Sequence, residues 1–219
     1  MSVPPLADSL AWAGAVAVLG GALRGLQWPR LAEPASAAVF GATLLALCLM
    51  RIASVPLAPG LELQFSGAAV ATLMFGWRYA LLALALATGM DAVATGAAWI
   101  GAPWAFLVGG ALPVAGSWWL LATTRRWLPR NPFVYILGVA FGGGLLCMAL
   151  AQGARAAVAT LAGAAGTGSA PGDYVLSLPA MMFAEGFFTG GALAVLVTWR
   201  PQWVATFDDE FYLKGGSRS

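Results

Sequence analysis

Apolar residues fill long stretches of this chain, and short groups of polar residues, glycines and prolines separate them. A bilayer core about 30 Å thick is crossed by a helix of roughly 20 apolar residues, so 219 residues with this pattern provide about seven crossings. Lipid offers no partner to backbone N–H and C=O groups, and long apolar runs satisfy these groups as helices. The pattern predicts an all-α polytopic transmembrane helical bundle with spans over residues 6–26, 35–52, 67–76, 77–98, 103–121, 132–157 and 174–198.

The third of these spans, 67–76, is too short to cross a bilayer, because it supplies roughly ten apolar residues. The segment before it contains two prolines and the polar residues Glu62, Gln64 and Ser66. Non-helical backbone lies at membrane depth only where protein or a water-filled cavity shields it. We therefore expect residues 61–66 to dip into the membrane and these three polar residues to contact a bound solute. The alternative is that they are ordinary loop residues.

Composition and charge give the bundle an orientation. The chain is 60% hydrophobic and 9% charged, with a mean hydropathy of +0.81. Only Arg51 and Arg155 fall near one side of the loop alternation, and by the positive-inside rule that side is external. We expect one transmembrane domain over residues 1–203, an external N-terminus and a solvated cytoplasmic tail over 204–219, in a multi-pass protein of the inner (cytoplasmic) membrane. The other side holds Arg24, Arg30, Arg78, Arg125, Arg126, Arg130, Arg200, Lys214 and Arg218.

Two carboxylates lie within predicted spans, Asp91 in the fourth and Glu185 in the seventh. A carboxylate inside a span costs on the order of 3 kcal/mol on insertion scales, and it usually faces a cavity or a partner. We expect both to bind substrate. The structural alternative is that each pairs with Arg51 or Arg155, or accepts hydrogen bonds from helix termini inside the bundle.

Sulfur-bearing residues in the external half of the bundle suggest a soft metal ion. Thiolate and thioether ligands favour ions such as Cu(I), whereas carboxylates and amides favour harder ions or polar organic solutes. In the alternative interpretation, Met and Cys are packing residues that fill gaps in a bundle rich in Leu and Ala. The candidate metal ligands are Cys48, Met90, Asp91, Cys147, Met181 and Glu185.

Pairs of small residues spaced by four, such as Gly186 with Gly190 and Ala83 with Ala87, allow close helix approach in lipid. In a bundle of this size we expect such faces to pack internally. The alternative is that one face docks a transmembrane coupling protein.

Two motifs carry a family resemblance. A proline-bearing polar loop after Arg51 precedes the short span that closes in Phe75-Gly76, and Ala184-Glu185-Gly186 opens an apolar run that ends at Trp199-Arg200-Pro201. Over about residues 45–203 this order resembles the substrate-capture subunit of energy-coupling-factor transporters of the cobalt and nickel type, the CbiM/NikM family. The resemblance implies seven spans, an external N-terminus, a transmembrane coupling subunit and separate ATPase subunits.

The chain departs from that family at its metal ligands. Residue two is Ser2 where the family has histidine, and residues 61–66 stand where the family has His-Pro-Thr-Gly. The chain contains no histidine at all, so the nickel or cobalt site is not carried over.

These observations predict a substrate-capture or permease component of an uptake transporter, for a transition metal ion or a small cofactor-like solute. The alternatives are a non-transporting subunit that assembles or stabilises a larger membrane complex, and a membrane protein that handles a metal or cofactor.

Without histidine or a nucleophile paired to a base we expect no enzyme activity. We expect no bound cofactor beyond a metal ion as substrate, and no nucleic-acid partner. With no Gly-x-x-x-x-Gly-Lys motif, ATP hydrolysis would require separate subunits.

Overall fold

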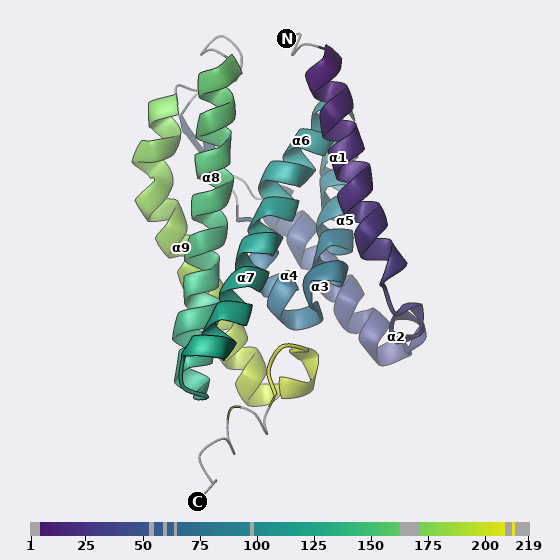
Figure 1. Ribbon diagram of the computed structural model, residues 1–219, viewed down its shortest axis with the longest axis vertical. Coiled ribbons are helices and arrows are strands. Elements are labelled where there is room, and N and C mark those ends of the chain that lie inside the picture. Colours follow the sequence, from purple (N-terminus) through teal and green to yellow (C-terminus); the bar gives the residue numbers. More distant parts are fainter. Residues whose placement is uncertain are drawn as a thin grey trace, which may run out of the picture.

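The computed structural model describes residues 5–52, 55–58, 61–63, 65–96, 99–162, 171–208 and 212. Long helices run up and down along the longest axis, and the two chain ends lie at opposite ends of the bundle (Figure 1).

The long helices follow the predicted spans. They are α1 (Pro5–Arg24), α3 (Pro34–Ile52), α5 (Trp77–Thr95), α8 (Gly142–Ala162) and α9 (Pro171–Trp199), together with α6 (Ala102–Phe106) and α7 (Leu112–Trp127), which a π-helical segment at Leu107–Ala111 joins. A second π-helical segment, Val134–Phe141, leads into α8, and the short α2 (Trp28–Ala32) links α1 to α3.

Four stretches of the described chain are helical, long and apolar enough to cross a membrane. This confirms the coarse prediction of a multi-span membrane protein with a helical bundle. The stretches are Pro34–Arg51, Ala102–Trp127, Val134–Val158 and Gly172–Trp199.

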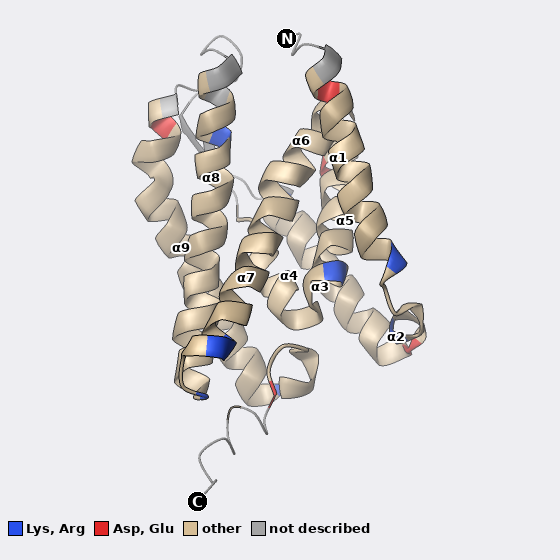
Figure 2. Ribbon diagram, viewed as in Figure 1, with Lys and Arg blue, Asp and Glu red and all other residues tan. Residues whose placement is uncertain are grey.

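Positive charge gathers at the end of the bundle near the C-terminus (Figure 2). Arg24 lies in the last turn of α1, and Arg125 and Arg126 lie in the last turn of α7. Both helices end there, so these residues share what we call the basic end. Arg51 is in the last turn of α3, which runs the other way.

The segment between α3 and the short third span contains a small antiparallel hairpin, an exception to the all-α prediction. Strand β1 (Val55–Ala58) pairs with β2 (Leu61–Leu63), with Val55 opposite Leu63. Glu62 lies in β2, and Gln64 lies outside the described residues. The sequence indicated a structured loop here but not its pairing, because β1 and β2 are only four and three residues long.

The short third span is helix α4 (Ala68–Phe75), which lies in the middle of the bundle (Figure 1). Its eight residues span about 12 Å, less than half of a bilayer core. All of them except Phe75 are buried. Gly67 before it and Gly76 after it have φ of +61° and +85°, values that L-residues with a side chain rarely adopt. Glycine at both positions lets the chain enter and leave this buried helix sharply.

Residues 204–208, the described start of the tail that we expected to be solvated, pack against the end of α4 instead. Ala205 N–H and Thr206 N–H donate to the carbonyls of Met74 and Leu73, at 2.8 Å and 3.3 Å. Helices leave their last carbonyls without partners, and these bonds supply them. Val204 and Phe207 join the core. The sequence did not predict this packing against α4, because the bonds from Ala205 and Thr206 are made by backbone N–H groups, which every residue except proline carries.

Helices α8 and α9 pack closely through small residues. A Cβ on Gly144 would lie 2.7 Å from the backbone oxygen of Glu185, and one on Gly190 would lie 3.1 Å from Phe141 Cβ. Ala83 and Ala87 of α5 are also buried. Both small-residue faces therefore pack inside the bundle, as expected from the sequence.

Replacing Gly144 by alanine should destabilise the bundle by about 1–3 kcal/mol, because the added methyl group meets backbone that cannot rotate away. Gly153→Ala is the matched control in the same helix, since a Cβ there meets no atom within 4 Å. Thermal unfolding in detergent should show a lower Tm for Gly144→Ala and an unchanged or slightly higher Tm for Gly153→Ala. Equal Tm values for the two variants would contradict the close packing.

Candidate functional site

The buried carboxylate of Glu185 holds the N-terminal end of α4. One carboxylate oxygen accepts a hydrogen bond from Ser66 N–H and the other from Gly67 N–H, each at 2.9 Å. Glu185 is 0% exposed. The first N–H groups of a helix have no partner within it, and the helix dipole makes this end positive, so a carboxylate suits it in both respects.

This contact matches the structural alternative considered for Glu185, which was hydrogen bonding to a helix terminus inside the bundle. Both carboxylate oxygens are engaged with backbone of this chain. Ser66, predicted as a solute contact, supplies one of the N–H groups, and its hydroxyl donates to the carbonyl of Gly109 at 3.3 Å. In this structure Glu185 and Ser66 therefore support α4.

Helices α8 and α9 contribute a second group of polar side chains, which we call the α8–α9 cluster: Gln152, Arg155, Met181, Cys147 and Glu185. Arg155 donates to Gln152 Oε1 at 2.9 Å, and Gln152 donates through Nε2 to Met181 Sδ at 2.6 Å. Cys147 is an electrostatic neighbour of Glu185, and its thiol donates to the carbonyl of Pro113 at 3.2 Å.

The π-helical segment Leu107–Ala111 lies against this cluster. A Cβ on Gly109 would lie 3.4 Å from Arg155 Nη2. Because glycine has no side chain, the guanidinium can approach the backbone of this segment closely. π-helical turns widen the helix and are frequent at functional sites. Gly109 thus brings together Arg155 and the hydroxyl of Ser66, at the entrance to α4.

Cys48, Met90, Asp91 and Arg51 form what we call the α3–α5 cluster. The thiol of Cys48 lies 3.6 Å from Met90 Sδ, and Asp91 interacts electrostatically with Arg51 and with Cys48. Arg51 is 8% exposed, although it lies in the last turn of α3. Asp91 therefore lies close enough to Arg51 for their charges to interact, which is the arrangement considered as the structural alternative for Asp91.

The candidate residues therefore form two clusters. The clusters lie near enough to each other for the like charges of Arg51 and Arg155 to interact. Among the residues that the structure describes, no three His, Cys, Asp or Glu side chains lie together as metal ligands. The six predicted ligands divide into Cys48, Met90 and Asp91 on one side and Cys147, Met181 and Glu185 on the other.

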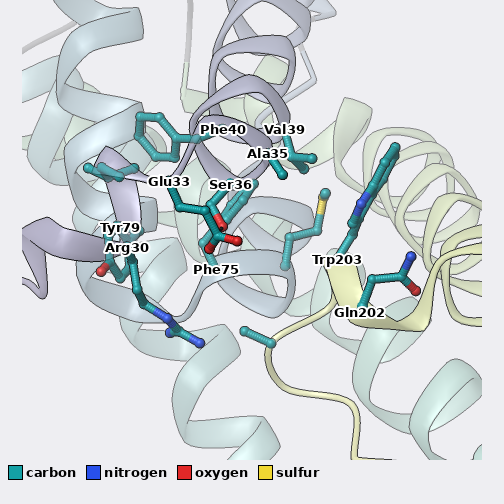
Figure 3. Close-up of a pocket in the computed structure, with 13 residues that line it drawn as sticks. Arg30, Glu33, Ala35, Ser36, Val39, Phe40, Phe75, Tyr79, Gln202 and Trp203 are labelled. Carbon is teal, nitrogen blue, oxygen red and sulfur yellow. Dashed lines mark hydrogen bonds between the residues drawn. The ribbon is translucent and has the colours of Figure 1, made fainter.

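Three cavities of the described structure lie away from these two clusters. One of about 310 Å³ lies where α2 and the start of α3 meet α4 and the chain after α9, and Figure 3 shows its lining residues, among them Glu33, Phe75 and Trp203. Another, of about 260 Å³, is lined by Arg30 and Arg78 at the basic end. A third, of about 170 Å³, is an apolar groove beside α1. Neither Asp91 nor Glu185 lines any of these three.

Comparison with protein-family models, with curated proteins and with solved structures gives no match for this chain.

The sequence pointed to Glu185 and Asp91 but assigned no binding role to Arg155. Its position could have indicated such a role, because Arg51 and Arg155 are the two arginines near the side of the bundle that otherwise lacks positive charge. An arginine within a span is costly and usually faces a cavity or a partner. The role of Gly109 could not be predicted from the sequence, because no characteristic residue marks a π-helical turn in the way that proline marks a helix break.

Replacing Glu185 by alanine should leave the buried N–H of Gly67 and the partly buried N–H of Ser66 without this partner, at a cost of up to about 1–3 kcal/mol for each. Glu185→Gln keeps one acceptor oxygen but turns an amide N–H toward a backbone donor, so it should also destabilise. Both effects can be measured as a loss of Tm in detergent.

The matched control is Glu33→Ala, which removes an exposed carboxylate that accepts from Ser36 at 3.1 Å. It should change stability by no more than about 0.5 kcal/mol. Wild-type stability of Glu185→Ala would show that the carboxylate does not hold α4.

Proposed function

We propose that this multi-span membrane protein is the substrate-capture component of an uptake transporter of the energy-coupling-factor type. The observation that supports it best is the half-length helix α4, buried in the bundle and preceded by a hairpin. Transporters build solute sites from interrupted spans, whose helix ends and freed backbone groups lie at membrane depth. The solute enters from the N-terminal side, and its contacts are near the entrance to α4.

The solute that this arrangement favours is a small anion or a polar organic molecule with an anionic group. Arg155 donates a hydrogen bond to the neutral amide of Gln152, and Tyr174 is one of its electrostatic neighbours. Guanidinium groups bind carboxylates and phosphates through two parallel hydrogen bonds. Because Glu185 is engaged with α4, Arg155 provides the solute contact and Glu185 provides the support.

A transition metal ion is the second candidate, and the contact between Cys48 and Met90 supports it. Two sulfur atoms 3.6 Å apart beside Asp91 form part of a soft ligand set. Arg51, which neighbours both Cys48 and Asp91, opposes a cation there. The anionic solute is therefore the preferred candidate.

Transport in this proposal needs partner subunits. The sequence has no Gly-x-x-x-x-Gly-Lys motif, so ATP is hydrolysed by separate ATPase subunits, and a transmembrane coupling subunit connects them to this chain. The resemblance to the CbiM/NikM family supports this division of labour. The alternative role in assembling a larger membrane complex has no comparable support from a particular contact.

The anion proposal predicts that some small carboxylate, phosphate or sulfonate raises the Tm of the purified protein in a thermal-shift screen. Arg155→Gln should weaken that effect by roughly tenfold or more in ligand concentration, since charge-assisted hydrogen bonds contribute about 1.5–3 kcal/mol. Arg24→Gln removes one positive charge at the basic end and should leave the response unchanged. The proposal fails if no anion stabilises the wild type, or if both variants respond like it.

Elemental analysis by mass spectrometry on detergent-purified protein tests the second candidate. We expect no stoichiometric transition metal, before or after incubation with a chelator and re-addition of Co²⁺, Ni²⁺ or Cu(I). A bound equivalent that disappears in a Cys48→Ala, Met90→Leu variant would replace the anion proposal with the metal one.

A further inference from the structure

The cavity of about 260 Å³ at the basic end has a strongly one-sided charge. Arg30, Arg78 and Arg125 all line it, and none of its described lining residues is acidic. Trp77 and Trp118 complete its walls. All three arginines are exposed, so their guanidinium groups can be reached from solvent or from lipid headgroups.

Two of these arginines are held in position by backbone contacts. Arg78 donates through Nη1 to the carbonyl of Gly25 at 2.8 Å, and its guanidinium carbon lies 4.9 Å from the centre of the Trp77 ring. A Cβ on Gly25 would lie 2.3 Å from that same carbon, so the guanidinium occupies space that glycine leaves open. Arg125 donates to the carbonyl of Thr206. The side chains are thus preorganised around the cavity.

The cavity of about 310 Å³ continues from this one, because Arg30, Phe75, Tyr79 and Ala205 line both. Its other walls include the apolar side chains of α3 and α4 that Figure 3 draws around Phe40 and Phe75. Its one acidic lining residue, Glu33, accepts a hydrogen bond from Ser36. A basic chamber thus adjoins a chamber with aromatic and aliphatic walls.

We propose that these joined cavities bind an anionic phospholipid, with its phosphate among Arg30, Arg78 and Arg125 and the start of an acyl chain against the walls around Phe40 and Phe75. Basic pockets between helices on the cytoplasmic side suit anionic headgroups, and the positive-inside rule assigns this end to the cytoplasm. Tryptophans favour the same interfacial depth. The site is independent of the solute site proposed above.

The positive-inside rule alone does not account for this arrangement. Arg24 and Arg126 lie at the same end, yet neither lines the cavity. Charge placed only to orient the chain in the membrane needs no shared cavity. These two residues therefore provide a matched comparison that removes the same number of charges from the same end of the molecule.

The experiment is native mass spectrometry of the full chain in detergent with added phosphatidylglycerol, phosphatidylcholine or inorganic phosphate. We expect the wild type to retain one phosphatidylglycerol in preference to phosphatidylcholine. Since each arginine near an anionic headgroup contributes roughly fivefold in affinity, the Arg30→Gln, Arg78→Gln variant should retain it at least about tenfold more weakly. The Arg24→Gln, Arg126→Gln variant should stay within about twofold of the wild type.

Arg30→Gln alone controls for a folding defect, since the Arg30 side chain makes no hydrogen bond to another described residue. This variant should retain phosphatidylglycerol about fivefold more weakly, with an unchanged Tm. An equal loss in both double variants would mean diffuse charge attraction and would overturn the proposal. So would equal retention of phosphatidylcholine. Displacement of the lipid by millimolar inorganic phosphate would identify a soluble phosphate ligand and overturn the assignment to lipid.

Discussion

The hydrogen bonds from Ser66 N–H and Gly67 N–H to the carboxylate of Glu185 are the contact on which the interior of this bundle depends. A helix that begins inside a membrane exposes unpaired N–H groups to a medium without water, which costs several kcal/mol for each group. The two carboxylate oxygens of Glu185 accept hydrogen bonds from these N–H groups, and their negative charge suits the positive end of the helix dipole. Burying a carboxylate in a membrane is unfavourable, and so is burying an unpaired N–H group. Each group satisfies the other here, so the two unfavourable terms are offset.

Helix α9 and the chain that follows it hold both ends of α4. Glu185 holds the N-terminal end, and Ala205 and Thr206 supply N–H donors to the carbonyls of Leu73 and Met74 at the other end. The Thr206 hydroxyl also bonds to Leu73 O at 2.6 Å and to the Tyr135 hydroxyl at 2.7 Å. The eight-residue α4 therefore lies between the polar residues around Glu185 and the cavities at the basic end.

The charged residues of the bundle have distinct physical tasks. Glu185 is buried and engaged with backbone, Asp91 neighbours Arg51, and Arg155 lies on Gly109 beside a neutral amide. At the basic end, Arg78 and Arg125 bond to carbonyls and line a cavity together. The molecule thus presents guanidinium groups in two different settings, one within the bundle and one around a cavity at the basic end.

The sequence by itself determined that this chain is a bundle of helices, several of them long and apolar enough to cross a membrane, because apolar run length depends on the bilayer rather than on neighbouring helices. It also marked α4 as too short to span and Glu185 as unusual. Only the tertiary structure decided that Glu185 faces Ser66 N–H and Gly67 N–H, that residues 204–208 pack under α4, and that the sulfur residues divide between two clusters. These contacts join residues far apart in the sequence, since Glu185 is 119 positions from Ser66, Cys48 is 42 from Met90 and Gln152 is 29 from Met181. No local pattern encodes such pairings, because they follow from how the helices pack.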